Sequence, residues 1–340
     1  MLAFALLEKG CAVQIVHNAA LPSSSRVAAG LYNPVVFKRL LPSWRAAEVV
    51  PFLVKKYSAL EALLQEKFLF SVNISKVIEN QHELETWEKR AHSEDIREFI
   101  LPKISHQNPQ GFKAPSVLGF GEVVQSGYVD TTIFLNAAHA YFNTLAILQN
   151  HTFDYHALEL CASGLVYQNE HYDELVFCEG FFVAQNPYFS FLPFKPVKGE
   201  VLTVRIPGFQ SKNILNKNFF LLPLPDGTFR LGATYDWKNL NFEPSVEAKN
   251  SLLARLSEYV SGEIEIMQHD AGVRPSSEDR RPILGPHPHH PQLHVFNGLG
   301  TKGVMLAPFF AEQLTNYLLD GKPLEHEVSA VRFYDLQKSV

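Results

Sequence analysis

Residues 270–308 read DAGVRPSSEDRRPILGPHPHHPQLHVFNGLGTKGVMLAP, and this stretch decides the fold. It contains Gly272-Val273-Arg274-Pro275, then a short apolar segment at Leu293–Asn297, then the glycine-rich turn Gly298–Gly303. Apolar residues continue at helical spacing from Val304 onward, which predicts a strand, a turn and a helix in that order. The first N–H groups of a helix have no partner within the helix, and glycines let a ligand approach them closely. The stretch therefore predicts a site for an anion or an electron-rich ring.

The pairing of this turn with Gly-x-Arg-Pro resembles the C-terminal signature of the FAD-dependent D-amino-acid oxidase superfamily. Glycine oxidase, sarcosine oxidase and the flavin domain of the tRNA wobble-uridine modification enzyme belong to that family. Its arginine binds the substrate carboxylate, which implies this role for Arg274; a structural arginine paired with Glu278 or Asp279 is the alternative. The family's glycine-rich turn lies along the flavin ring. The match implies cofactor contacts along the whole turn, at Gly298, Leu299, Gly300, Thr301, Lys302, Gly303, Val304 and Met305.

Three further residues bear on the chemistry of the implied site. Lys302 would stabilise negative charge on a reduced flavin ring, unless it simply faces solvent. Tyr235 follows Gly-Ala-Thr at the end of a predicted strand, where its hydroxyl would touch the substrate; a half-buried core tyrosine is the alternative. Phe220 stands where the resemblance places a pocket tyrosine of glycine oxidase. The lost hydroxyl argues against a substrate as small as glycine.

The composition is that of an ordinary globular protein. The chain has 340 residues, of which 46% are hydrophobic, and this length suffices for two domains. The net charge is −5 and no basic block occurs, which argues against a nucleic-acid surface. The three cysteines form no C-x-x-C motif, so neither a disulfide framework nor a cysteine metal site is predicted. We predict a cytoplasmic protein without a membrane span.

The beginning of the chain resembles half of a dinucleotide-binding unit. Met1–Gly10 predicts the end of a helix, and Ala12–His17 predicts a buried strand. Helix, glycine and strand form the second half of a βαβ unit, whose first strand and G-x-G-x-x-G turn do not occur in this sequence. His17 stands where the Rossmann pattern places an acid on the ribose hydroxyls. A polar residue that closes the strand is an equally good interpretation.

Two further segments are matched to the cofactor through the resemblance. Residues 22–34, PSSSRVAAGLYNP, are similar to the Ser-x-x-Ala-Gly segment that passes over the pyrophosphate and the flavin in the family. A polar loop is the alternative. Leu175–Cys178 predicts a returning Rossmann strand that ends beside the dinucleotide. The implied cofactor contacts in these two segments are Ser24, Ser25, Arg26, Ala29, Gly30, Leu31 and Gly180.

The fold class predicted is α/β plus α+β. A Rossmann-like FAD-binding domain, without its first strand and G-x-G-x-x-G turn, is interleaved with an antiparallel-sheet substrate domain. The cofactor domain is predicted at 1–75, 115–180 and 270–325, and the substrate domain at 76–114 and 181–269. His287, His289 and His290 lie in a Pro-rich loop with no carboxylate or cysteine nearby in the sequence. We predict a solvated loop there, and no metal site.

Together these features predict an FAD-dependent oxidoreductase. It would oxidise the C–N bond of a small amine or amino acid by hydride transfer to flavin, with dioxygen or another acceptor taking the electrons. The sequence leaves the substrate, the acceptor and the oligomeric state open. Two alternatives also stay open: a degenerate, flavin-free family member that acts by binding alone, and a tRNA-modification-type flavin oxidase. A flavin absorption band in the purified protein would separate the first of these from the rest.

We expect the native protein to extend upstream by roughly 15–25 residues, the length of one strand and the glycine turn. The first strand of a Rossmann sheet is central, so its loss leaves backbone groups unpaired at roughly 1–3 kcal/mol each. The test compares the 340-residue chain with an upstream-extended form from the same reading frame. A short form that is soluble, melts cooperatively and holds one FAD as tightly as the long form would contradict this expectation.

Overall fold

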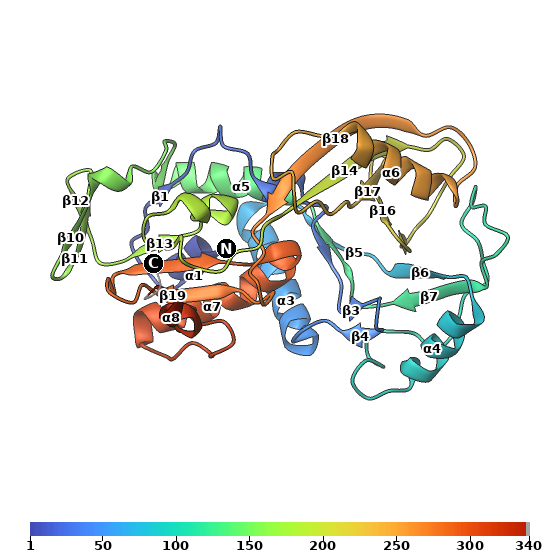
Figure 1. Ribbon diagram of the computed structural model, residues 1–340, viewed down its shortest axis with the longest axis horizontal. Helices are drawn as coiled ribbons and strands as arrows, with labels where there is room; N and C mark the ends of the chain where they lie inside the picture. The colour runs from blue at the N-terminus through green and yellow to red at the C-terminus, as the bar shows by residue number, and fades with distance from the viewer. Residues whose placement is uncertain (338–340) are drawn as a thin grey trace. The chain divides into compact units, whose positions relative to one another are not determined.

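A computed structural model describes residues 1–337 (Figure 1). The chain divides into two compact units that alternate along the sequence. The first unit comprises Met1–Ser24, Asn136–Val197 and the chain from Val273 onward, and the second comprises Ser25–Leu135 and Lys198–Gly272. Because the chain enters each unit more than once, each core is built from segments that are far apart in the sequence.

The predicted domain boundaries differ from the boundaries of these units. Residues 25–75 and 115–135, which the sequence analysis assigns to the cofactor domain, belong to the second unit. The units are defined by which residues pack together, and not by which residues bind cofactor or substrate. The assignment of 1–75, 115–180 and 270–325 to a cofactor domain therefore stays a prediction.

Parallel strand pairs characterise the first unit. β1 (Ile15–Val16) pairs in parallel with β9 (Leu148–Gln149), and β13 (Leu175–Phe177) pairs in parallel with β20 (Leu293–Asn297). β19 (Ile283–Pro286) lies antiparallel on the other side of β20. Every residue of β20 is buried, as a central strand of an α/β sheet requires.

The remaining elements of the first unit are helices and a small antiparallel sheet. α1 (Leu2–Glu8) packs against α7 (Gly303–Asp320), and Lys9 forms an ion pair with Glu312 at 3.6 Å. Gly10, which follows α1, has φ +79°, in agreement with the predicted left-handed helix end. The other elements are α5 (Thr131–Thr144), which begins in the second unit, η1 (Tyr155–Ala157), β10 (Leu158–Cys161), β11 (Gly164–Tyr167), β12 (Glu170–Tyr172), η2 (Gly180–Gln185), η3 (Gly300–Lys302), η4 (Ala330–Phe333) and α8 (Tyr334–Gln337).

A seven-stranded sheet forms the centre of the second unit (Figure 1). The strand order is β18-β14-β17-β16-β15-β6-β7. β17 is antiparallel to both of its neighbours, whereas β15 pairs in parallel with β6. The strands span β6 (Ile74–Ile78), β7 (Gly119–Val123), β14 (Val197–Arg205), β15 (Ile214–Asn216), β16 (Phe220–Pro223), β17 (Phe229–Gly232) and β18 (Glu265–Arg274).

Helix α6 (Val246–Ser257) covers this sheet. Its Leu252 and Leu256 are buried in one cluster with Leu202 of β14 and Leu231 of β17. Smaller elements complete the unit: α2 (Ser24–Val27), β2 (Leu31–Tyr32), β3 (Val35–Val36), β4 (Leu41–Pro42), α3 (Ala46–Leu64), β5 (Leu69–Ser71), α4 (Gln81–Ala91) and β8 (Gly127–Val129).

None of the helices within residues 1–337 combines the length and the hydrophobicity that crossing a bilayer requires.

His287 departs from the predicted solvated loop. Its side chain is only 5% exposed, because the rings of Tyr188, Phe189 and Phe191 meet it edge-on. The ring of His290 stacks on it with the centroids 4.8 Å apart. Burial, with a smaller contribution from the neighbouring histidines, lowers the pKa of His287 to about 4. The prediction was wrong for this residue because residues distant in sequence supply the aromatic cover.

The buried imidazole makes the stability of the fold depend on pH. The pKa of His287 is about 4 in the folded chain against an ordinary 6.5, so the unfolded chain takes up this proton first. The free energy of unfolding should be highest above pH 6.5 and should fall toward pH 4, by on the order of 1–3 kcal/mol from this group. Urea unfolding of wild type and His287→Leu at neutral and mildly acidic pH measures the effect.

The variant should lose much of the difference between the two pH values. His289→Gln is the matched control, because the His289 side chain lies in the same loop but is exposed. An equal pH dependence in wild type and His287→Leu would contradict the prediction.

Candidate cofactor and substrate site

The ends of the parallel strands β13 and β20 lie side by side. Asn297, the last residue of β20, donates from Nδ2 to the carbonyl oxygen of Gly180 at 2.9 Å, and its Oδ1 accepts from the N–H of Gly298 at 2.9 Å. In open α/β sheets, ligands bind beyond the carboxyl ends of the strands. The structure therefore brings the predicted contacts Gly180 and Gly298 together at the edge where a ligand is expected.

The turn after β20 has the predicted order of strand, turn and helix. Gly298 (φ +75°) and Gly300 (φ +53°) are left-handed, which glycine adopts readily. A Cβ on Gly300 would lie 3.1 Å from Ser276 Oγ, which is tighter than an ordinary contact, so a side chain here would displace Ser276. α7 begins at Gly303, and the preceding Lys302 makes no side-chain hydrogen bond that caps the helix. The side chain of the N-cap residue therefore does not bond to the first N–H groups of α7.

The Gly-x-Arg-Pro segment lies against this turn. β18 ends at Arg274, the N–H of Gly300 donates to the carbonyl oxygen of Pro275 at 3.3 Å, and Ser276 bridges to Leu299. Two motifs that are separate in the sequence are therefore neighbours within the first unit. Arg274 itself is half-buried.

The two acids considered as structural partners of Arg274 pair with other cations. Glu278 forms an ion pair with Lys195, and Asp279 forms one with Arg332 at 2.9 Å. The bond to Arg332 contributes to a lowered pKa of Asp279, although burial acts in the opposite direction. The role of Arg274 toward a substrate carboxylate stays a prediction, as does its structural alternative.

Lys302 occupies the position between the glycine turn and α7. Its side chain is half-buried, and burial together with the nearby Arg281 guanidinium lowers its pKa to about 8. The fully solvent-facing alternative does not fit this position. A lysine with a pKa near 8 gains charge when an anion comes close, which suits a site for developing negative charge.

A half-buried carboxyl group, that of Glu179, lies beside Gly180, and the sequence analysis missed it. Asn186 donates to Glu179 Oε2 at 2.7 Å, and the hydroxyl of Tyr155 donates to Oε1. Burial raises the pKa of Glu179. The only signal in the sequence was the acid next to a glycine at a predicted strand end. A small pocket of about 110 Å³ adjoins this turn, with Gly180, Phe181, Leu192, Phe194 and Pro275 among its lining residues.

The serine-rich segment is a short helix followed by a strand. α2 covers Ser24–Val27, and Leu31 begins β2, which pairs with β8. Gly30 has φ +69°, and a Cβ there would lie 1.8 Å from the carbonyl oxygen of Val129. The close packing against β8 alone therefore explains why this position is a glycine. The cofactor contacts implied for Ser24, Ser25, Arg26, Ala29, Gly30 and Leu31 stay a prediction.

Tyr235 belongs to the second unit and is not a core residue. It follows the end of β17 at Gly232, and 55% of its surface is exposed. Phe220 pairs with Gly232 across the sheet, and its ring occupies the space that a side chain there would need. The core-tyrosine alternative is wrong, whereas substrate contact stays a prediction.

His17 follows β1, and its ring meets that of His139 edge-on with the centroids 4.8 Å apart. Its proposed contact with a ribose stays a prediction. Across residues 1–337, no group of three or more His, Cys, Asp or Glu side chains is arranged to hold a metal ion.

The residues of the first unit fit a planar, electron-rich group. The glycines of the left-handed turn have no side chains that would keep a ligand away from the backbone. The first N–H groups of the following helix lie next to the turn, and Lys302 supplies a positive charge. These are the properties that one edge of a flavin ring requires. This turn lies at the ends of β13 and β20, which the side chain of Asn297 connects.

Curated relatives match part of the chain. The glycine oxidase of Pseudomonas putida is 31% identical over 137 residues, which cover 39% of this chain and 37% of the relative. A tRNA 5-methylaminomethyl-2-thiouridine biosynthesis bifunctional protein of Marinobacter nauticus is 28% identical over 138 residues, or 37% of this chain and 22% of the relative. The matched part of the chain thus spans well under half the length of these relatives.

Solved structures match nearly the whole chain. The iminodiacetate oxidase of Chelativorans sp. BNC1 superposes with a TM-score of 0.77 at 19% identity, covering 96% of this chain and 95% of the other. The glycine oxidase of Bacillus cereus gives a TM-score of 0.69 at 20% identity, with 96% and 93% covered. At these identities the likeness concerns the fold, and it confirms the predicted mixed α/β, Rossmann-like fold class. The family model described as FAD dependent oxidoreductase matches residues 1–317, and the chain therefore belongs to this family, whose cofactor is FAD.

Proposed function

We propose that this chain is an oxidoreductase that oxidises the C–N bond of a small amine or amino acid. The observation that carries the proposal is the contact between the Gly-x-Arg-Pro segment and the glycine turn before α7. The segment that carries the Arg274 guanidinium lies next to the glycine turn, whose properties suit a flavin ring. The relatives named above support an amine that carries a carboxylate, because glycine and iminodiacetate both have one.

The chemistry divides between the cofactor and the chain. FAD, when bound, supplies the acceptor for the hydride that leaves the carbon bearing nitrogen. The substrate also loses a proton from nitrogen and becomes an imine. The chain needs no nucleophile for this reaction; it must orient the substrate and keep water away.

Arg274 is the proposed orienting group. A guanidinium binds a carboxylate through two parallel N–H···O bonds, which fix both the position and the direction of the substrate. The N-terminus of α7 and Lys302 would favour negative charge at the ring edge. Dioxygen or another acceptor would then take the electrons. Tyr235 stays a proposed substrate contact.

Replacing Arg274 by methionine should weaken the binding of carboxylate-bearing amines. The loss of a charge-assisted, two-bond contact removes on the order of 3 kcal/mol, so KM should rise by roughly 100-fold. Steady-state kinetics on protein with its flavin absorption intact measures this. An amine of the same size without a carboxylate is the matched control substrate, and its KM should change little. Unchanged kinetics in Arg274→Met would contradict the assignment.

Replacing Gly300 by valine should reduce flavin retention. A valine is strained at φ +53°, and its Cβ would lie 3.1 Å from Ser276 Oγ, so the turn must shift. The flavin-to-protein ratio after gel filtration measures the effect. Gly321→Val is the matched control, because Gly321 has φ +65° at the other end of α7 with open space around it. Equal flavin content in both variants and wild type would argue against placing the turn at the ring.

A further inference from the structure

Strand β18 (Glu265–Arg274) is the last strand at one edge of the seven-stranded sheet (Figure 1). β14 pairs with it on one side, and within residues 1–337 no strand pairs with it on the other. A strand bonds to its two neighbours through alternate backbone groups, so half of the N–H and C=O groups of β18 point away from β14. In residues 265–272 these groups form an open row, which is a template for pairing with another chain.

The first half of this strand is uncovered on both faces. Glu265–Gln268 are four consecutive exposed residues. Because successive side chains of a strand point to opposite faces, neither face of this segment is packed against a core. Two of the four residues are large and apolar: Ile266 is 40% exposed, and Met267 is 49% exposed. An exposed edge strand that carries apolar side chains is a predicted site for the addition of another strand.

The features that usually protect a sheet edge are missing from this strand. Residues 265–272 contain no lysine and no proline, and the strand is 10 residues long. Its two acids form ion pairs within the sheet: Glu265 pairs with Arg205 at 3.6 Å, and Asp270 pairs with Arg230 at 3.0 Å. Their charges are therefore compensated, and they do not repel an approaching strand.

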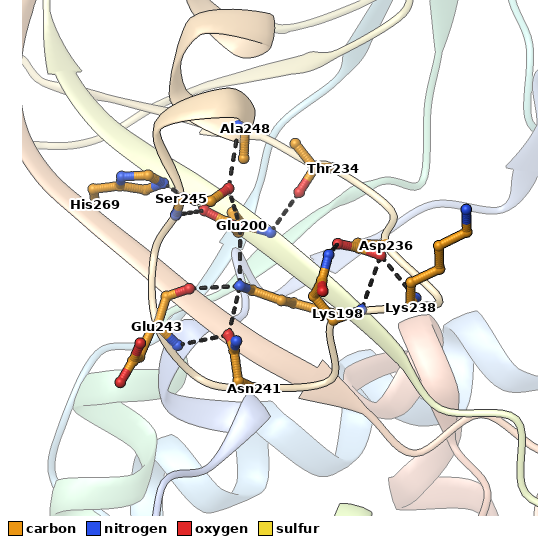
Figure 2. Close-up of polar contacts among 11 residues, drawn as sticks. Lys198, Glu200, Thr234, Asp236, Lys238, Asn241, Glu243, Ser245, Ala248 and His269 are labelled. Carbon is orange, nitrogen blue, oxygen red and sulfur yellow. Dashed lines mark hydrogen bonds and ion pairs between the residues drawn. The ribbon is translucent and has the colours of Figure 1, made fainter.

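Side chains from two other elements hold β18 in place (Figure 2). Nε2 of His269 lies 2.8 Å from Oε2 of Glu200, which belongs to β14. The same carboxylate accepts from the N–H and the hydroxyl of Ser245, the N-cap residue of α6, at 2.8 and 2.9 Å. Val246, the first residue of α6, is exposed, so the helix start that is connected to β18 adds apolar surface.

A buried ion pair completes this network. The side chains of Lys198 and Glu200 are both buried, with Nζ and Oε1 3.3 Å apart, and Lys198 also donates to Asn241 Oδ1 in the loop before α6 at 2.7 Å. Replacing a buried ion pair by apolar residues is often neutral or stabilising, so stability alone does not explain it. The network fixes β18, β14 and the start of α6 to one another. A rigid edge loses little freedom when a partner binds, which favours association.

A second copy of this chain supplies a complementary strand. Two β18 strands related by a two-fold axis perpendicular to the sheet run antiparallel, and the open edge of each copy meets the same edge of the other. An axis at Met267 places this residue opposite its own copy. Ile266 then faces Gln268 across the axis. Glu265 faces His269, so no two like charges lie opposite each other along the exposed segment.

We propose that two copies of this chain pair along the outer edge of β18, so that their seven-stranded sheets join into one continuous antiparallel interface. The partner is a second copy because one surface then satisfies the open backbone groups of both chains. The pairing involves residues 265–272 of the second unit alone, and it does not depend on the identity of the substrate.

The first test measures the mass of the 340-residue chain in solution. Gel filtration coupled to light scattering is run over a range of protein concentrations up to the limit of solubility. We expect the mass to rise from that of one chain to that of two as the concentration increases. The mass of a single chain at every concentration would overturn the pairing.

The second test uses charge at the proposed axis. Met267→Lys and Met267→Glu each place two like charges opposite each other, so each variant alone should raise the dimer dissociation constant at least about tenfold. An equal mixture of the two variants should recover the dimer, because opposite charges then meet. Leu319→Lys is the matched control: Leu319 is 47% exposed on α7 of the first unit, and its variant should dimerise like wild type.

Two outcomes of this test would overturn the pairing. One is a dimer that forms equally well in Met267→Lys, Met267→Glu and wild type. The other is a loss of the dimer in both variants without recovery in the mixture, because residue 267 would then not face its own copy.

The third test follows the backbone itself. Amide hydrogen exchange in residues 265–270 should be slower at concentrations where wild type is dimeric than where it is monomeric, since the added strand bonds to the open N–H groups. Met267→Lys should show no such difference at the same concentrations. A wild-type dimer whose exchange in this segment equals that of the monomer would place the contact elsewhere and refute the proposal.

Discussion

The cofactor side of this protein depends on one buried amide. Asn297 uses both atoms of its side chain, accepting from Gly298 and donating to Gly180, and so it fixes the ends of two parallel strands to each other. Without this tie, the turn before α7 and the turn after β13 would lose the side-chain link that joins them directly. A buried side-chain amide that lost either partner would leave an unsatisfied group, at a cost of roughly 1–3 kcal/mol. The same interaction therefore stabilises the fold and shapes the site.

The two units use opposite means to hold functional residues. In the first, left-handed glycines and the start of α7 leave backbone groups uncovered at the proposed site. In the second, a buried lysine and glutamate fix a loop whose exposed side chains are aromatic. This division is consistent with a fold that is kept at 19% identity, because backbone geometry tolerates substitution better than specific side-chain contacts do.

The elements that the sequence predicts correctly are those set by local spacing. The turn between β20 and α7 is one of them, because its glycines and the apolar residues after it lie within a few turns of chain. The network around Glu200 was not predictable in this way: Ser245 and His269 reach it from segments that only the folded sheet brings near. The cover of His287 and the partners of Glu179 were missed for the same reason. Local patterns predict elements, whereas the protonation of a buried group depends on contacts between distant segments.

The position of Lys302 has a consequence for proton balance. Its pKa of about 8 means that the amine is partly neutral in mildly alkaline solution. Any anion that settles at the glycine turn raises this pKa, so binding draws a proton from the buffer. Affinity for a negatively charged ligand is then thermodynamically linked to proton concentration and weakens as the solution becomes more alkaline than pH 8. A ligand that carries no charge at this position is exempt from the linkage.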